Sequence, residues 1–200
     1  MMAAFLIGAL PFSYWLGCLV LRQDIRTVGD RNPGAVNVFR SGGRGWGWVA
    51  LCLDYAKGFL PVLWWQTHAG GLLEMHPLLT VGTALAPVVG HAFSPFLLGR
   101  GGKAVTVTFG IWSGLTLWVA PVVMGIALAL GHVALRLRPH GWTVLLGLLV
   151  IPPTLLVLHA PNELWWVWLG NTAVVIFKHR DDLRQRPHWA GLATSRRDGT

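Results

Sequence analysis

The sequence predicts an all-α protein that crosses a membrane about seven times. Hydrophobic residues make up 54% of the chain and charged residues only 12%, whereas a soluble domain carries roughly 25% charged residues. The apolar residues form long runs separated by short polar segments. The Lys and Arg residues are confined almost entirely to alternate polar segments, which is typical of a polytopic membrane protein.

The predicted spans cover residues 3–21, 46–66, 77–95, 104–119, 121–137, 142–158 and 163–177. Pro11 is expected to kink the first span, and a break near Pro121 separates the fourth from the fifth. Several spans are shorter than the ~20 residues of a perpendicular crossing, so we expect some of them to be partly broken or to lie where the protein thins the membrane. Residues 1–200 are interpreted as one integral membrane domain.

The charge distribution predicts the orientation. Of the 16 Lys and Arg residues, all except Lys57 fall after the first, third and fifth spans or in the tail. Cytoplasmic segments carry such an excess, so the N-terminus is expected outside and the C-terminus in the cytoplasm. The net charge of +8 is explained in this way, and no soluble domain remains to carry a basic face for nucleic acid.

A glycine-rich loop follows the third span and contains Gly101, Gly102 and Lys103. Glycines let a turn expose its N–H groups, which bind oxyanions when a cation lies beside them. The loop is therefore a candidate phosphate site, although its spacing does not fit a Walker A loop. The alternative is a tight turn that carries two positive charges.

A second polar segment, residues 28–40, combines turn residues with Asp30, Asn32, Asn37 and Arg40. If a helix begins after Pro33, Asn37 and Arg40 share one face. Arginine suits bidentate phosphate binding. The alternative interpretation is a solvated loop.

Two further groups lie in or near the spans. Asp54 and Lys57 are three positions apart in the second span, where charges normally pair or line a cavity. His91 and His132 are interpreted as interhelical hydrogen-bonding residues. No spacing of His, Cys or carboxylate residues predicts a metal site.

The segment after the last span contains His179, Arg180 and Asp182. It is interpreted either as a membrane anchor or as part of a site at the membrane surface. Because the predicted topology places it beside the other two polar segments, we expect one site that receives an anionic substrate from the cytoplasm and an acyl chain from the bilayer.

Three ordered motifs in these segments resemble those of the bacterial acyl-phosphate-dependent glycerol-3-phosphate acyltransferases, over nearly the whole chain. The first is Asp24–Gly29 with Asn32–Arg40 and Asp54–Gly58, the second is Gly90-His91, Pro95-Phe96 and Gly101–Lys103, and the third is Lys178–Asp181. The family's topology of seven spans with the N-terminus outside agrees with the charge distribution.

The resemblance implies that the 1-hydroxyl of glycerol 3-phosphate attacks an acyl phosphate, giving lysophosphatidate and phosphate, in a bacterial cytoplasmic membrane and with no metal or cofactor. An enzyme that forms acyl phosphate is a possible partner. Lys103, His179 and Arg40 are the implied catalytic residues. Substrate binding is assigned to Asp30, Asn32, Gly34, Asn37, His91, Gly101, Gly102, Arg180 and Asp182.

The chain departs from the family's pattern at several positions. Asp30-Arg31 stands where the family has Ser-Gly, and a carboxylate there repels phosphate unless Arg31 compensates. Val36, Ala104 and Asp182 replace Thr, Gly and Asn, and residues 138–141 replace a Tyr-Val-Ser segment. The alternatives are therefore a paralogue without activity or with another substrate, and a small anion transporter, which the nearly uncharged opposite loops argue against.

Overall fold

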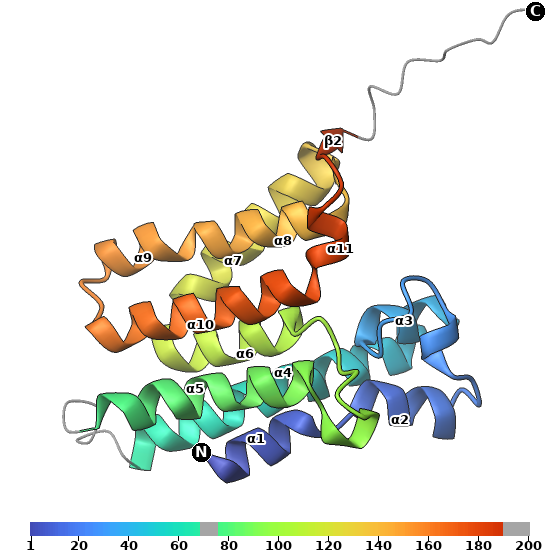
Figure 1. Ribbon diagram of the computed structural model, residues 1–200, viewed down its shortest axis with the longest axis horizontal. Coiled ribbons are helices and arrows are strands. Elements are labelled where there is room, and N and C mark those ends of the chain that lie inside the picture. Colours follow the sequence, from blue (N-terminus) through green and yellow to red (C-terminus); the bar gives the residue numbers. More distant parts are fainter. Residues whose placement is uncertain (69–75, 190–200) are drawn as a thin grey trace, which may run out of the picture.

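The computed structural model describes residues 1–68 and 76–189, which form a helical bundle with one short two-stranded ribbon (Figure 1). The predicted helical fold is thus confirmed. The elements in chain order are α1 (Met2–Ala9), α2 (Phe12–Leu19), η1 (Ile25–Thr27), α3 (Ala35–Arg40), α4 (Arg44–His68), α5 (Pro77–Ala92), η2 (Pro95–Leu97), α6 (Val105–Thr116), α7 (Val119–Ala129), η3 (Leu130–Ala134), β1 (Leu137–Arg138), α8 (His140–Leu149), α9 (Ile151–Val157), α10 (Asn162–Lys178), α11 (Arg180–Leu183) and β2 (His188–Trp189).

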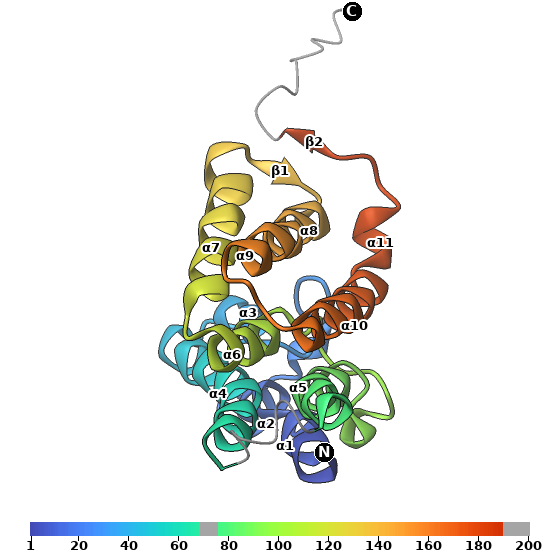
Figure 2. The same cartoon turned by 90° about the vertical axis from the view of Figure 1, so that its left-hand side faces the viewer.

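The long helices lie in three groups. Figures 1 and 2 show α1, α2, α4 and α5 on one side, α6 and α10 in the middle, and α7, α8 and α9 on the other side. The largest buried cluster connects these groups, with Val88 of α5, Trp112 of α6 and Leu148 of α8 among its members. The middle helices therefore hold the two outer groups together.

Helix breaks follow the chemistry of the sequence. The predicted kink at Pro11 is a break between α1 and α2, because proline cannot supply an N–H to the preceding turn. The break expected near Pro121 lies earlier, at Leu117 and Trp118, which both have positive φ. Pro121 itself is in the first turn of α7, where a backbone N–H would have no hydrogen-bond partner within the helix.

The predicted fifth span is too long. Helix α7 ends at Ala129 and continues as a π-helical turn, η3, only to Ala134. Residues 137–138 are instead strand β1, in which Leu137 pairs with Trp189 and Arg138 with His188 of β2. A partner strand far along the chain is not detectable from local apolar periodicity, so the sequence did not reveal this ribbon.

Three helical segments of the described chain are long and apolar enough to cross a membrane, namely Met2–Leu19, Pro77–Leu97 and His140–Val157. Two shorter apolar segments are Val105–Thr116 and Val119–Ala134. The count of seven spans remains a prediction. Large apolar side chains such as Leu78, Trp48 and Trp166 are exposed around the bundle, which suits a surface in contact with lipid.

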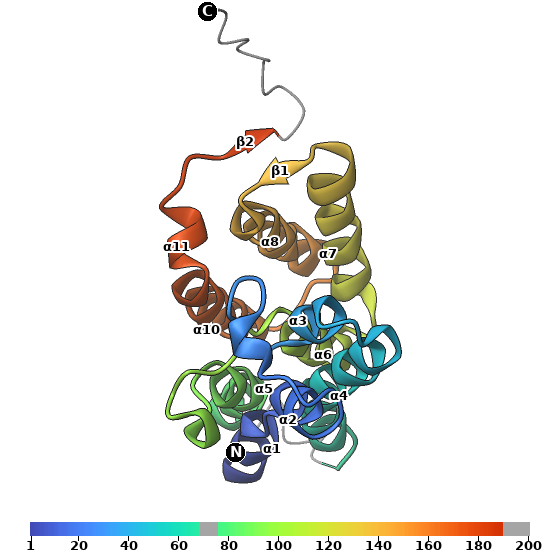
Figure 3. The same ribbon diagram turned by 90° about the vertical axis from the view of Figure 1, so that its right-hand side faces the viewer.

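The polar segments predicted to share one side do lie at one end of the bundle. Figure 3 views the end where α3, α11, β1 and β2 are found. Met1 lies toward the opposite end (Figure 1). Of the basic residues assigned to this end, Arg196 and Arg197 fall outside the described residues. The side of the membrane to which this end faces remains a prediction.

Helices α4 and α6 pack closely through glycines. A side chain at Gly110 would place its Cβ 2.3 Å from the carbonyl oxygen of Tyr55, and one at Gly58 would lie 2.5 Å from the carbonyl oxygen of Val107. Close backbone approach through small residues is a common way to join helices in a bilayer. This contact fixes α6, and with it the loop that precedes α6, against α4.

Candidate active site

A cavity of about 420 Å³ opens at the polar end, between α3, α6, α7, α8 and the end of α10. Part of its wall is polar, with Asp30, Arg40, Lys103 and His179 among the lining residues. Another part is apolar and includes Leu51, Leu128 and Val144. One space thus offers both charged groups and a surface for an alkyl chain.

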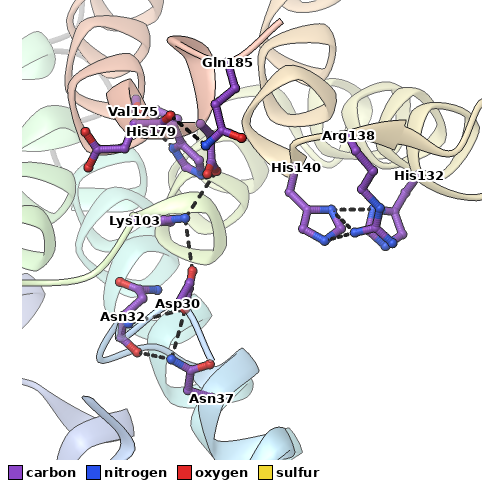
Figure 4. A network of polar contacts seen from close by, with 12 residues as sticks. Asp30, Asn32, Asn37, Lys103, His132, Arg138, His140, Val175, His179 and Gln185 are labelled. Atoms are coloured by element: carbon purple, nitrogen blue, oxygen red, sulfur yellow. Dashed lines mark hydrogen bonds and ion pairs between the residues drawn. The ribbon is translucent and has the colours of Figure 1, made fainter. Parts of the chain in front are cut away.

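Lys103 lies between two carboxylates. Its Nζ is 3.0 Å from Oδ2 of Asp30 and 3.3 Å from Oδ2 of Asp182 (Figure 4). The lysine lies two residues before the start of α6, and the first residues of that helix, Val105 and Thr106, also line the cavity. The N–H groups of a first helical turn have no partners within the helix and favour anions.

Hydrogen bonds of the Asn37 side chain hold the segment that carries Asp30. The side-chain amide of Asn37 donates to Oδ1 of Asp30 at 3.0 Å and to the carbonyl of Asn32 at 2.8 Å. Arg40 donates to Oδ1 of Asn37 at 3.2 Å, so the predicted shared face of these two residues is confirmed. Asn37 is buried and holds Asp30 in place, whereas Arg40 lines the cavity.

The charge of Asp30 is stabilised in the fold. Burial opposes its ionisation, but the hydrogen bond and the charge of Lys103 outweigh this effect and keep the pKa of Asp30 below its usual value. The nearest additional cation is Arg40, whose Nη1 is 3.9 Å from Oδ1. The sequence analysis names Arg31 as the residue that could compensate the charge of Asp30. The structure corrects this: within residues 1–68 and 76–189 the ion pairs of Asp30 are with Lys103 and Arg40, because the turn brings the carboxylate to the glycine loop.

His179 faces the same space and is 4% exposed. Its Nδ1 lies 2.9 Å from the carbonyl oxygen of Val175, so Nδ1–H is the donor and Nε2 of the neutral ring is an acceptor. Burial lowers the pKa of the imidazole, and this effect prevails over the hydrogen bond to Val175 and the nearby carboxylates. His179 is therefore neutral at pH 7 and able to accept a proton.

A buried ion pair supports the site from below. Nζ of Lys57 lies 2.8 Å from Oδ1 of Asp54, and both side chains are almost fully buried. Ser13 donates to Oδ2 of Asp54 at 2.6 Å, and Lys57 donates to the carbonyl of Leu10 at 2.8 Å. The predicted pairing of Asp54 and Lys57 is confirmed, and the pair also ties α4 to the break between α1 and α2.

The glycine loop is anchored by residues on either side of it. The N–H of Gly102 donates to the carbonyl of His91 at 3.0 Å, and a Cβ at Gly102 would overlap the ring of His91. Nζ of Lys178 donates to the carbonyls of Ala92 and Gly101 at 2.9 and 2.8 Å. These bonds fix Lys103 relative to the end of α10, where His179 lies.

The structure brings together most of the predicted site residues. Asp182 does not line the cavity itself but forms an ion pair with Lys103, which does. The predicted residues that line the cavity are Asp30, Asn32, Gly34, Arg40, His91, Lys103 and His179. Four other predicted residues do not line it, namely Asn37, Gly101, Gly102 and Arg180. The N–H of Gly102 is already bonded to His91, and Arg180 donates to the carbonyl of Phe177.

Sequence reasoning missed part of the wall. His140 and Thr143 of α8 and His132 of η3 also line the cavity. From the sequence, His132 is interpreted as an interhelical hydrogen-bonding residue and residues 138–141 only as a segment that replaces Tyr-Val-Ser. The available signal was the density of basic side chains in that segment. Across residues 1–68 and 76–189 no group of three or more His, Cys, Asp or Glu side chains is arranged to hold a metal ion.

Comparison with known proteins shows which protein family matches this chain. A family model described as glycerol-3-phosphate acyltransferase matches residues 1–187. Glycerol-3-phosphate acyltransferase 1 of Thermotoga maritima is 35% identical over 191 residues, with 90% of this chain and 93% of that protein covered. The glycerol-3-phosphate acyltransferase of an Anaeromyxobacter species is 35% identical over 184 residues, with 92% of this chain and 89% of the relative covered.

Two crystal structures of PlsY, an integral membrane glycerol 3-phosphate acyltransferase, have a similar fold. The lysophosphatidic acid form has a TM-score of 0.78 at 23% identity and covers 92% of this chain and 87% of its own. The glycerol 3-phosphate form has a TM-score of 0.77 at 24% identity and covers 95% of each chain. At this identity the similarity establishes the fold.

Proposed function

This chain belongs to the glycerol-3-phosphate acyltransferase family, and on that premise we propose that it transfers a fatty acyl group from an acyl phosphate to the 1-hydroxyl of sn-glycerol 3-phosphate. The products are lysophosphatidate, a precursor of phospholipids, and inorganic phosphate. The observation that carries the proposal is a single cavity in which Lys103 and the first turn of α6 share the wall with apolar side chains.

The phosphate and the alkyl chain of the donor suit two different parts of this cavity. Its phosphate is a dianion, for which Lys103 and the free N–H groups of the first turn of α6 are suitable partners. Its alkyl chain is suited to the wall that contains Leu51, Leu128 and Val144. The carbonyl carbon then lies between the phosphate site and the apolar wall, within the space that His179 faces.

The reaction needs no covalent enzyme intermediate, because acyl phosphate is already activated. The hydroxyl oxygen attacks the carbonyl carbon, the bond from that carbon to the phosphate oxygen breaks, and phosphate leaves with the electron pair. The hydroxyl proton passes to Nε2 of His179 or to the departing phosphate. Positioning of the two substrates and neutralisation of the leaving group by Lys103 supply the rate.

The proposal includes the topology predicted from charge. We propose seven spans within a single domain, with the cavity opening at the cytoplasmic face of a bacterial membrane. The clustering of the polar segments at one end supports this orientation, since 15 of the 16 Lys and Arg residues were assigned to that side by sequence alone. Glycerol 3-phosphate then enters from the cytoplasm and the donor from the bilayer.

The test is an end-point assay on detergent-purified protein with palmitoyl phosphate and labelled glycerol 3-phosphate. We expect lysophosphatidate from the wild type, and a fall in kcat/KM of about 100-fold or more in Lys103→Ala, the usual effect of removing one charge-stabilising donor. Arg100→Ala is the matched control, because Arg100 is an exposed cation of the same loop that does not line the cavity. Near-wild-type turnover by the Lys103 variant would remove its assigned role.

Absence of product from folded wild-type protein would instead favour another acceptor or a non-catalytic protein. The two carboxylates on Lys103 give that alternative a specific basis, since each competes with a phosphate for the same ammonium group. The same assay repeated with uncharged acceptors such as glycerol separates these possibilities.

A further inference from the structure

A second cavity, of about 270 Å³, lies between the β1–β2 ribbon and one face of α8. Figures 2 and 3 show the ribbon beside the start of this helix. All the residues that line the cavity are apolar, among them Leu137, Trp142, Leu146, Leu149, Pro187 and Trp189. None of its lining residues lines the cavity that contains Lys103. We refer to this second cavity as the ribbon groove.

The ribbon has an apolar face and a basic face. Successive side chains of a strand point to opposite faces. Leu137 pairs with Trp189 across the ribbon, and both line the groove. The next pair, Arg138 with His188, does not line it, and the guanidinium of Arg138 contacts the ring of His140 (Figure 4). The ribbon therefore directs its apolar side chains at α8 and its basic side chains away from the groove.

The other wall of the ribbon groove is continuous with the surface that faces lipid. Helix α8 begins the segment His140–Val157, which is long and apolar enough to cross a membrane. Trp142, Leu146 and Leu149 recur at the spacing of a single helical stripe, and Leu149 is 50% exposed. In an integral membrane protein, lipid tails are the medium beside such a stripe. The groove is thus open to an alkyl chain that comes from the bilayer.

Two arginines border the ribbon groove. Arg136 and Arg186 each directly precede a residue of the lining, and both are exposed. In the described part of the chain, neither arginine forms an ion pair with an acidic side chain. The guanidinium group suits bidentate binding of phosphate, and basic residues next to a membrane span attract anionic lipids. The apolar groove therefore has cationic groups available at its edge.

Two tryptophans of the lining fit the depth of the lipid headgroups. Trp142 has its ring in the groove, while its indole N–H donates to the carbonyl of Gln185 at 2.9 Å. Trp189 lines the groove from the ribbon and is 55% exposed. Tryptophan rings are enriched at this level because one part is apolar and the other is polar. These two rings mark the boundary between the apolar stripe of α8 and the basic edge.

We propose that the ribbon groove binds one anionic phospholipid of the bilayer. An acyl chain lies along the stripe of α8, and the phosphate is held by Arg136 and Arg186. A soluble anion has no use for the apolar groove, and a neutral lipid has none for the arginines. The bound lipid joins the ribbon to α8. This helix also packs on α11, where a Cβ at Gly141 would lie 2.6 Å from Cβ of Asp182.

The headgroup is tested by native mass spectrometry of the full chain in detergent, titrated with palmitoyl-oleoyl phosphatidylglycerol or phosphatidylcholine. We expect the first phosphatidylglycerol to bind about tenfold more tightly than the first phosphatidylcholine, because only the former carries a net negative charge. Arg136→Gln combined with Arg186→Gln should abolish most of this preference. The matched control is Arg22→Gln combined with Arg100→Gln, which removes two exposed arginines outside the groove and its edge and should retain the preference.

The acyl chain is tested by filling the groove. Leu146→Trp places a larger side chain in it and should weaken the binding of phosphatidylglycerol about tenfold or more. Leu156→Trp is the control, because Leu156 is an exposed residue of α9 outside the groove. Thermal unfolding gives the second measurement. Phosphatidylglycerol should raise the midpoint of the wild type and of both controls more than that of the test variants, since a ligand stabilises the state that binds it.

Three results would overturn the proposal. The first is equal affinity of the wild type for the two lipids, or an unchanged preference in the double arginine variant. The second is a protein dimer in the same spectra that is lost in Leu146→Trp, which would assign the groove to a second copy of the chain. The third is a wild type that binds no lipid, together with a lower unfolding temperature of Leu146→Trp, which would assign the groove to part of the chain itself.

Discussion

The ammonium of Lys103 lies 3.0 Å from Oδ2 of Asp30, so the proposed phosphate-binding lysine already has a carboxylate partner. The two residues come from different polar segments, the glycine loop before α6 and the turn before α3. Both residues line the cavity, and under the proposed function the carboxylate of Asp30 competes with the donor's phosphate for the ammonium of Lys103. We therefore expect the strength of this ion pair to affect the KM for the proposed donor.

Asp30→Ser is expected to lower KM for the acyl phosphate about two- to fivefold, because a half-exposed ion pair is worth about 0.2–1 kcal/mol and its loss frees Lys103. Steady-state kinetics at saturating glycerol 3-phosphate measure this. Asp24→Ser is the matched control, since Asp24 pairs with Arg26 outside the cavity and its loss should leave KM unchanged. A rise in KM for Asp30→Ser would show that the carboxylate has a role of its own in catalysis.

Asp54→Asn is expected to reduce the free energy of unfolding by about 3 kcal/mol or more, because it leaves the buried ammonium of Lys57 without its counter-ion. Denaturation in detergent measures the change. Asp24→Asn, which removes the charge of a partly exposed aspartate, should reduce the free energy of unfolding by less than about 1 kcal/mol. The double variant Asp54→Leu with Lys57→Met should recover much of the loss, since it removes both buried charges. Equal stabilities of Asp54→Asn and Asp24→Asn would contradict the supporting role of the buried pair.

His179 should make folding stability depend on pH in a defined window. Burial lowers the pKa of this imidazole in the folded state, whereas the unfolded chain binds the proton near pH 6.5. The unfolded state therefore gains protons first as the pH falls, so the contribution of His179 is fully present above about pH 6.5 and is lost below it. Thermal unfolding at pH 7.5 and 5.5 should show a smaller loss of stability in His179→Gln than in the wild type.

The matched control for the pH experiment is His159→Gln, because His159 is exposed at the turn between α9 and α10. Its removal should leave the pH dependence of unfolding as in the wild type. The activity of the wild type should follow the same direction, with the acid limb of kcat/KM below about pH 6.5. An identical pH dependence of unfolding in the wild type and His179→Gln would contradict the lowered pKa.

Gly110→Ala should destabilise the protein by about 1–3 kcal/mol, the usual effect of overpacking. Its Cβ would lie 2.3 Å from the carbonyl oxygen of Tyr55, so α4 and α6 must separate. Gly125→Ala is the control: its Cβ meets only Phe109 at 3.7 Å, and it should gain about 0.5–1 kcal/mol from helix propensity. Thermal unfolding of both variants decides this, and a tolerated Gly110→Ala would mean that the contact is not tightly packed.

The sequence by itself determined the helical class, the positions of most helices and the shared end of the polar segments. These features are encoded locally, in apolar runs, in Pro11 and in the placement of Lys and Arg. The pairing of Asp54 with Lys57 and the shared face of Asn37 and Arg40 were predictable for the same reason. Each pair lies one helical turn apart, and helix geometry alone brings the partners together.

Only the tertiary structure decided which charges meet across the bundle. Lys103 and Asp182 are 79 positions apart. No local sequence pattern indicates that Lys103 pairs with Asp182 or with Asp30. The pairing of β1 with β2 likewise joins residues that are far apart along the chain, Leu137 with Trp189 and Arg138 with His188. Such contacts are set by how α6, α8 and α11 pack, and packing is a property of the whole chain rather than of any one segment.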